Sequence, residues 1–565
     1  MNTLYKLKLF LWLLILTATT QLNANTFYAN DMASLKSAFQ SVNAGTGGDI
    51  IKITGNIQMV SAMVIDGVTY PYVDYLPAIS RDVTITADPN PDGSPQYTID
   101  GGGMGYFWIG NPYDASNVTT LKNCTVENLI ISNMLMGGLV VTLSDESVSA
   151  AKVNNCIALN NSGTGIIATA INGKTIISHC VSKNNDPCGF ASSARETIIQ
   201  DCMTENNKKD GFSVQYPQPL FSSFVTAYAQ LYNCTSNRNR GMGILIGDVK
   251  NILMNGCSTA GNAGSGIAIE YSDNTGYGQY VISNSSAAGN QSNGFYLEGV
   301  SGKIINCTVS HNWKGIYYNN DYPRKVYNSI SYNNEYGDLA AYGKETLYLY
   351  NTVYDKENEG YAPVEKYNCR TEDPKLSGMT TNGLLTENPD EIAYYGLSEG
   401  SSALGFADKN LITRQMLTEL PGSTLPEVND WFNSIITEEY VNNILAYDQV
   451  GNSRFFNGNN YDAGSISGTG GKTGIKEIPA LQHALLYPNP AGKNCTIAFD
   501  MEKSGNVKIS IFNISGVSLM KLYDGYVERG NFKYSFDAGS LPAGLYTVLI
   551  YTGGKITGER LLIAR

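Results

Sequence analysis

Six acidic residues in the middle of this 565-residue chain stand where glycine-rich turns meet apolar stretches. Two carboxylates can hydrolyse a glycosidic bond when their spacing admits a water. Alternatively, carboxylates can hold Ca²⁺ against a uronate while a Lys or Arg removes the adjacent proton. A solvated acid at a strand end is the alternative for each of them. The candidates are Asp186, Glu205, Asp210, Glu270, Asp273 and Glu298.

From these acids and the neighbouring Lys209 we single out four candidate catalytic residues and two candidate ligands for Ca²⁺. The catalytic candidates are Asp186, Asp210, Lys209 and Glu270, and the possible Ca²⁺ ligands are Asp186 and Asp210. The histidines His179, His311 and His483 form no constellation, and no metal-ligand spacing, nucleophile elbow or phosphate loop occurs in the sequence. Polysaccharide hydrolysis and lysis are thus the two chemistries that we test against these residues.

Charge and aromatic content restrict the partners. The net charge is −12, and the sequence has no basic stripe that could replace phosphate counterions, which argues against nucleic acid. Tyrosines are dense from Tyr317 to Tyr354. They could stack on sugar rings, although packing and cover for sheet edges are the alternative roles.

The elements that must position these residues follow from an internal repeat between residues 155 and 355. A small residue is followed five positions later by Asn, and Gly and an apolar strand come next. The period is mostly 22 to 24 residues, which is typical of a β-solenoid. We expect the asparagines to bond to one another in a stack and the glycines to adopt φ > 0. The asparagines are Asn161, Asn185, Asn207, Asn239, Asn262, Asn290, Asn312 and Asn334.

Most of the ten cysteines occupy the small-residue position of the repeat, so we expect a stack of buried free thiols rather than disulfides. Cys188 stands at a loop position and is the exception. The stretch Met32–Gly48 has helical apolar spacing and predicts a cap over the first coil. Residues 1–24 have the basic start, short apolar run and small final residue of a signal peptide. No other stretch is apolar enough to span a bilayer.

The cap, the stretch ITADPNPDGSPQYTIDGGG and the repeat resemble right-handed β-helix proteins of the pectate-lyase type. After the coils, Asp373-Pro374-Lys375-Leu376, residues 397–404, residues 448–454 and residues 461–464 resemble the tail of the β-helix proteins called choice-of-anchor Q. Ser402 replaces the usual Pro, and Gly405-Phe406 replaces the usual Asp-x-Gly. This resemblance covers residues 26–467 and implies architecture.

The coil from Asn206 to Ser213 resembles the calcium coil of lysine-dependent pectate lyases. Only Asp210, Gly211 and the aromatic Phe212 match that pattern, because Lys209 and Ser213 stand where acids are usual. The lyase base comes from the following coil, where this chain has Leu245. The departures disfavour lyase chemistry and favour an unrecognised specificity or a non-catalytic role.

The last 80 residues open with Tyr487-Pro488-Asn489-Pro490, contain the turn LPAGLY (541–546) and end in a basic and then apolar tail. These features are similar to the C-terminal sorting domain of type IX secretion substrates in the Bacteroidetes, with Arg560 where Lys is usual. The resemblance implies a small Ig-like β-sandwich and the type IX secretion machinery as a partner.

The sequence therefore predicts an all-β protein. It would have a signal peptide (1–24), a right-handed parallel β-helix with an N-terminal helical cap and a closing segment (25–467), a linker (468–485) and a sorting domain (486–565). We expect a secreted or outer-surface protein that binds or acts on polysaccharide, with Ca²⁺ as the candidate cofactor. The alternative is a non-catalytic adhesin or structural surface protein.

Overall fold

The chain divides into two compact units, Met1–Thr197 and Ile198–Arg565, which are described in turn. The expected signal peptide, apart from Ala24, and the expected linker, apart from Leu485, lie outside the described residues. The computed structural model describes residues 24–65, 68–73, 75–110, 121–143, 149–216, 227–270, 279–299, 301–319, 321–356, 360–376, 396–419, 426–449, 454, 458–466, 485–487, 491, 493–501, 504–513, 518–542, 544–552 and 555–563.

The first unit begins with the predicted cap. Helix α2 (Met32–Ala44) starts at Asp31, whose side chain accepts the Ser34 N–H in a capping box. Its apolar face is buried. Strand β1 (Thr26–Ala29) pairs in parallel with β2 (Asp49–Ile53), which pairs with β6 (Val83–Ala87). The predicted cap helix and the strand that follows it are thereby confirmed.

Parallel coils follow the cap. One sheet of the first unit contains β3 (Ile57–Gln58), β7 (Tyr97–Asp100), β10 (Leu129–Ser132), β13 (Ile157–Leu159) and β15 (Val181–Lys183). Further parallel strands are β8 (Phe107–Ile109), β9 (Asn123–Glu127), β11 (Leu139–Thr142), β12 (Ala150–Asn154) and β14 (Ile166–Ser178). Strands β4 (Val60–Ile65) and β5 (Val68–Val73) follow β3 in the sequence and form an antiparallel hairpin. Strand β16 (Phe190–Gln200) runs through the boundary between the units.

The coils of the second unit repeat three strands each. The short strands are β17 (Met203–Glu205), β20 (Thr235–Asn237), β23 (Ser258–Ala260), β26 (Ser286–Ala288), β29 (Thr308–Ser310), β32 (Ile330–Tyr332) and β35 (Val353–Tyr354). The strands after the asparagine turn are β18 (Phe212–Gln215), β21 (Ile244–Gly247), β24 (Ile267–Glu270), β27 (Asn293–Glu298), β30 (Lys314–Asn319) and β33 (Leu339–Tyr342). The third set is β19 (Tyr228–Tyr232), β22 (Asn251–Asn255), β25 (Gln279–Ser283), β28 (Ser301–Ile305), β31 (Arg324–Tyr327), β34 (Leu347–Tyr350) and β36 (Val364–Tyr367).

The recurring asparagines stack within each unit. In the first unit, Asn161 donates its backbone and side-chain N–H groups to Oδ1 of Asn185, at 3.0 and 2.8 Å. In the second unit the same pair of bonds runs from Asn207 through each successive asparagine to Asn334. These side chains are buried, so each bond satisfies polar groups that water does not reach.

The recurring glycines serve a different purpose from the one expected, and the prediction of φ > 0 is wrong for Gly211 and Gly266 and for their counterparts in most coils. A Cβ on Gly211 would lie 2.0 Å from Ser236 Oγ in the next coil, and one on Gly266 would lie 2.7 Å from the Gly294 carbonyl. Close approach between coils therefore requires glycine. The left-handed conformation falls instead on the residue before each small position, as in Asn155, Asn233, Asn284, Asn306 and Asn328.

All ten cysteines are free, which confirms the expectation for the thiols. Nine are buried, including Cys188, and Cys369 is partly exposed. The backbone N–H of Cys156 lies 3.4 Å from Sγ of Cys180, so neighbouring thiols stack inside the coils. Burial raises the pKa of the Cys156 and Cys234 thiols well above the usual range, which keeps them protonated and unreactive.

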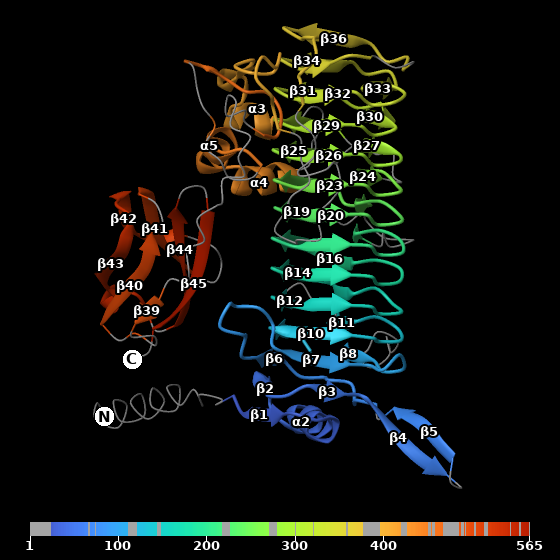
Figure 1. Cartoon of the computed structure of the whole chain (residues 1–565), viewed down its shortest axis with the longest axis vertical. Coiled ribbons are helices and arrows are strands. Elements are labelled where there is room, and N and C mark those ends of the chain that lie inside the picture. The colour runs from blue at the N-terminus through green and yellow to red at the C-terminus, as the bar shows by residue number, and fades with distance from the viewer. Residues whose placement is uncertain are drawn as a thin grey trace, which may run out of the picture. The chain divides into compact units, whose positions relative to one another are not determined.

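Three short helices cover one face of the second unit's coils (Figure 1). They are α3 (Arg414–Thr418), α4 (Pro426–Ile435) and α5 (Glu438–Ala446). Their buried side chains, such as Phe432 and Ile444, form one cluster with Val281 and Ile305 of the coils. The sequence analysis did not predict these helices.

The closing segment forms hydrogen bonds with the coil asparagines that have a left-handed backbone conformation. Arg454 is buried, and its Nη2 donates to Asn284 Oδ1 and to the Gly464 carbonyl, both at 3.0 Å. The Tyr461 hydroxyl donates to Asn306 Oδ1 at 2.6 Å and accepts from Asn328 Nδ2 at 2.8 Å. The tail motif that resembles choice-of-anchor Q proteins thus supplies structural anchors.

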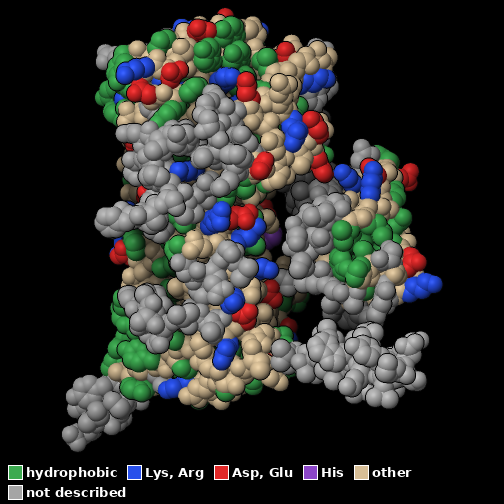
Figure 2. All heavy atoms as spheres, turned by 180° about the vertical axis from the view of Figure 1, so that it is seen from behind, with side chains coloured by type: hydrophobic (Ala, Val, Ile, Leu, Met, Phe, Trp, Pro, Cys, Tyr) green, Lys and Arg blue, Asp and Glu red, His purple; other side chains and the backbone are tan. Residues whose placement is uncertain are grey.

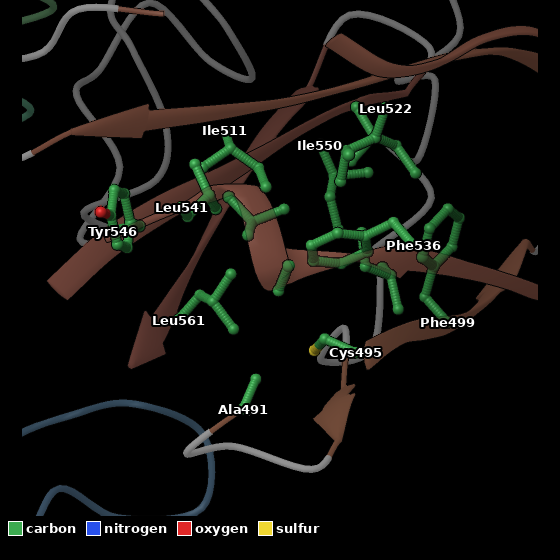
Figure 3. Packing of buried hydrophobic residues seen from close by; sticks show 14 of the residues in the cluster. Ala491, Cys495, Phe499, Ile511, Leu522, Phe536, Leu541, Tyr546, Ile550 and Leu561 are labelled. Carbon is green, nitrogen blue, oxygen red and sulfur yellow. The ribbon is translucent and has the colours of Figure 1, made fainter. Parts of the chain in front are cut away.

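The C-terminal residues form two antiparallel sheets. One contains β39 (Leu485–Tyr487), β40 (Asn494–Met501) and β43 (Gly530–Asp537). The other contains β42 (Ser518–Val527), β41 (Gly505–Asn513), β44 (Gly544–Thr552) and β45 (Lys555–Ile563). Side chains from both sheets, among them Phe499, Ile511, Phe536 and Ile550, share one core (Figure 3). The Ig-like assignment stays a prediction.

Candidate functional site

The outer face of strands β24, β27, β30 and β33 carries a group of tyrosine, glutamate and asparagine side chains that we consider as a candidate binding site. Alternate residues of a strand point to opposite sides, and Ile267, Phe295 and Ile316 are fully buried inside the coils. The residues between them therefore face outward. We call the following residues the tyrosine–glutamate face: Glu270, Tyr296, Glu298, Tyr317, Asn319 and Tyr342.

Strand pairing aligns these residues in two rows. Tyr296 is paired with Tyr317, and Glu298 is paired with Asn319, which is paired with Tyr342. Ile269 is paired with Leu297, so Glu270 and Glu298 are the next residues along neighbouring strands. Parallel strands lie about 4.8 Å apart. The two carboxylates therefore extend from adjacent coils of the same sheet.

Glu298 is held in place by donors on both oxygens. The Tyr296 hydroxyl donates to Oε2 at 2.8 Å, and Asn319 Nδ2 donates to Oε1 at 2.9 Å. Burial and the bond to Glu298 raise the pKa of Tyr296 to about 12, so its hydroxyl remains a donor at neutral pH.

Glu270 is half-buried and lies in a negative environment. Burial raises the pKa of its carboxyl group, and the charges of Glu298 and Asp210 raise it further. A pair of carboxylates with different surroundings is the arrangement that separates an acid from a base in glycoside chemistry. Here it also makes the face repel other anions.

A continuous row of aromatic rings runs beside the carboxylates. Tyr296 and Tyr317 stack with ring centroids 5.5 Å apart and planes at 13°. Tyr317 and Tyr342 are 5.3 Å apart, and Tyr342 meets the exposed ring of Tyr361 at 5.5 Å. Lys314 Nζ lies 4.9 Å from the centre of the Tyr317 ring. Sugar rings can lie along aromatic faces of this kind while their hydroxyls reach the flanking polar groups.

The acidic candidates on the asparagine turn have structural partners. Asp210 is buried beside Lys209, whose Nζ is 3.7 Å from Asp210 Oδ2. Asp210 Oδ1 accepts the Met242 backbone N–H at 2.8 Å, which ties one coil to the next. Glu205 is buried and forms an ion pair with Arg238. These bonds account for both acids without a ligand.

The remaining candidates are dispersed. Asp186 belongs to the first unit, where its backbone N–H donates to the Asn161 carbonyl. Asp273 and His483 lie outside the described residues. His179 Nδ1 contacts Asn154 Oδ1, and both ring nitrogens of His311 contact Ser310 and Asn333. In the part of the chain that the structure describes, no three His, Cys, Asp or Glu side chains gather to hold a metal ion.

The lyase-like coil has the expected register. Ser213 is paired with Leu245, so Leu245 occupies the outward position next to the coil that resembles a calcium site. It is nearly buried and has no basic group to remove a proton. The neighbouring outward positions on this row are Ala268 and then Tyr296. The row thus changes from aliphatic to aromatic side chains along the coils.

Two residues of the tyrosine–glutamate face, Tyr296 and Asn319, were missed from the sequence, although Glu270, Glu298 and the later tyrosines were candidates. The missing signal was the alternation within residues 293–298 and 314–319, where apolar residues alternate with Tyr, Glu or Asn. Reading the two stretches in one register would have placed Tyr296 beside Tyr317 and Asn319 beside Glu298.

The surface around the coils is mixed in charge. Lysine, arginine, aspartate and glutamate side chains are interspersed on the side drawn in Figure 2. The described residues contain no helix that is long and apolar enough to cross a membrane.

Comparisons with known proteins agree with this architecture. Residues 113–277 match the model of the right handed beta helix region, and residues 222–386 match that of the periplasmic copper-binding protein (NosD). Residues 485–564 match the secretion system C-terminal sorting domain. No curated protein matches the chain.

One solved structure with some similarity is that of tailspike protein 3 of bacteriophage CBA120, at 14% identity and a TM-score of 0.32. The alignment covers 63% of this chain and 61% of the tailspike chain. The chain thus spans about three fifths of that protein's length.

The sorting domain implies that the type IX secretion machinery exports the chain. The match to a periplasmic family along the coils agrees with a location outside the cytoplasm. The chain is a right-handed parallel β-helix protein with a C-terminal sorting domain of the type IX secretion system, and it is secreted or held at the cell surface.

Proposed function

We propose that this exported protein binds an uncharged polysaccharide along the tyrosine–glutamate face. The observation that carries the proposal is the unbroken row of rings Tyr296, Tyr317 and Tyr342 beside Glu270 and Glu298. Rings give apolar contact to the faces of sugars, and carboxylates accept bonds from sugar hydroxyls.

The charge of the face supports an uncharged ligand. Glu270 and Glu298 lie on the face itself, and Asp210, which is paired with Lys209, adds to the negative potential at Glu270, while Lys314 lies beside the row of rings. A uronate or sulfate placed here would be repelled by more acids than it would be attracted by bases. The proposal therefore departs from the Ca²⁺-dependent uronate chemistry that the coil of Asp210 suggested.

The same proposal assigns a role to each segment of the chain. Residues 1–24 would direct initial export and be removed. Residues 25–467 would form the binding domain, 468–485 a linker and 486–565 the domain that the secretion machinery recognises.

Affinity electrophoresis of the full chain tests the proposal. Gels would contain neutral glucans, mannans or xylans in one set, and polygalacturonate or sulfated polysaccharide in the other. Retardation by at least one neutral polysaccharide, with none by the acidic ones, is the expected result. Mobility unchanged across a broad neutral panel would contradict the proposal and favour an adhesin or structural protein.

A further inference from the structure

Inside the second unit, three residues at equivalent positions of neighbouring strands form a row, and the middle residue is a glycine. Tyr280 of β25 is paired with Gly302 of β28, and Gly302 is paired with Arg324 of β31. A Cβ on Gly302 would lie only 2.4 Å from the Tyr280 ring. The ring of Tyr280 therefore occupies the space that a side chain would fill in the next coil.

Tyr318 of β30 completes the group. The guanidinium carbon of Arg324 lies 5.5 Å from the centre of the Tyr318 ring. Tyr280, Tyr318 and Arg324 are all fully buried. Burial is the main cause that raises the pKa of both tyrosines, and each tyrosine is also affected by Arg324. The two hydroxyls and the guanidinium thus share one enclosed region.

The polar atoms of this group are incompletely satisfied. Arg324 donates from Nη1 to the Tyr342 carbonyl and from Nη2 to the Glu345 carbonyl, both at 2.9 Å. Its Nε is buried without a hydrogen-bond partner among the described residues, and the buried hydroxyls of Tyr280 and Tyr318 interact with each other but have no further partner there. Buried polar groups are normally paired, and a buried charge requires compensation.

We propose that Arg324, Tyr280 and Tyr318 form an interior binding site for a small monovalent anion of the halide class. The group offers the Arg324 N–H, at least one tyrosine O–H donor and a positive charge, which an acceptor-only ligand matches. A water molecule would complete the hydrogen bonds but would leave the charge of Arg324 without added compensation. The anion would link β25, β30 and β31 inside the coils and stabilise their stacking.

Bromide identifies such a site directly because it scatters anomalously. Crystals of the full chain grown in sodium bromide should show an anomalous peak within hydrogen-bonding distance of Arg324 Nε and the two hydroxyls. Thermal unfolding provides the second readout. Replacing gluconate by chloride at constant ionic strength should raise the Tm by about 2 °C or more, because the ligand binds the folded state.

The variant Tyr280→Phe/Tyr318→Phe keeps both rings and removes both hydroxyls, so its Tm should lose the dependence on chloride. Tyr327→Phe is the matched control, because Tyr327 lies on the same strand as Arg324 but packs against the covering helices. It should keep the dependence. The crystallographic test uses the unaltered chain and does not depend on the variants folding. Absence of the bromide peak, or a peak occupied equally well when bromide is omitted, would overturn the proposal in favour of water.

Discussion

Asn334 donates its backbone N–H and its side-chain amide to one oxygen of Asp338, at 3.0 and 2.7 Å. These are the two bonds that Asn312 makes to Asn334. The other oxygen of Asp338 accepts the backbone N–H groups of Asp355 and Lys356, both at 2.9 Å. Asp338 therefore takes the place of a further asparagine and ends the ladder with its donors satisfied.

This ending predicts the effect of Asp338→Asn. An amide can accept from Asn334 through its oxygen, but its NH₂ would then face the two backbone donors of residues 355 and 356. Leaving them unpaired in a buried place should cost about 2–3 kcal/mol of stability. Chemical denaturation of the variant should show the loss. Asp355→Asn makes the same chemical change in an exposed side chain. It is the control and should leave the free energy of unfolding nearly unchanged.

The close approach of coils predicts that Gly211→Ala is destabilising. The added methyl group would overlap Ser236 Oγ and the Gly243 carbonyl, and overpacking of this kind costs roughly 1–3 kcal/mol. In Gly247→Ala the nearest atom is a Gln215 side-chain carbon at 3.4 Å, an ordinary contact. Denaturation midpoints should separate the two variants clearly. Equal denaturation midpoints for the two variants would contradict the idea that close approach between coils requires glycine at position 211.

Lys303 predicts a pH dependence of stability. Its ammonium group donates to the carbonyls of Leu417 and Glu419 at the end of α3. Burial, followed by the charge of Lys325, lowers its pKa to about 7. Below pH 7 the lysine is charged in both the folded and the unfolded chain. Between pH 7 and about 10 the unfolded chain holds more protons, so stability rises with pH.

The slope from this lysine should be at most about 1.4 kcal/mol per pH unit. Denaturation of the wild type and of Lys303→Met at pH 7.5 and 9.5 measures it as the difference between the two proteins. Lys325→Met removes a charge that lowers the pKa of Lys303, so this variant should retain a pH dependence but over a narrower pH range than the wild type. A stability difference that is the same at both pH values would contradict the low pKa.

The negative charge of the face predicts a change of specificity. In the double variant Glu270→Gln/Glu298→Gln the shape is kept and two charges are lost, while one oxygen of each carboxylate becomes an NH₂ group, so the amide at position 298 accepts from only one of Tyr296 and Asn319. Binding of polygalacturonate should strengthen by roughly tenfold at low salt, since removing repulsion worth about 1.4 kcal/mol has that effect. The gain should shrink as salt is added. Affinity electrophoresis at two ionic strengths measures the gain in binding and its decrease with salt. If the double variant still fails to bind polygalacturonate, the charges of Glu270 and Glu298 are not the reason that the wild type does not bind it.

The sequence was sufficient for features that repeat from coil to coil. Asn161 to Asn334, the buried thiols and the cap helix each follow from a local pattern, because stacking forces equivalent residues into equivalent positions. The role of the glycines was misjudged, since the contact of Gly211 with Ser236 depends on the distance between coils rather than on local conformation.

Features that occur once were harder to predict. The partners of Asp338, the cover of Val281 by Phe432 and the space that Gly302 leaves for Tyr280 are contacts between distant segments. The helices α4 and α5 did leave a signal, because Trp431, Phe432, Ile435 and Ile436 have helical spacing and Thr437 is an N-cap residue. The site depended on register, which aligns Tyr296 with Tyr317 and cannot be read from one strand alone.

The most direct measurement is polysaccharide binding by Tyr317→Ala, because this ring stacks on Tyr296 and contacts the tilted ring of Tyr342. Isothermal titration with the neutral polysaccharide selected on the gels should show affinity lower by at least tenfold, consistent with loss of a central aromatic contact. Tyr28→Ala removes an exposed ring of the first unit and should bind normally. Equal affinity of Tyr317→Ala and the wild type would contradict the assignment of this face as the binding site.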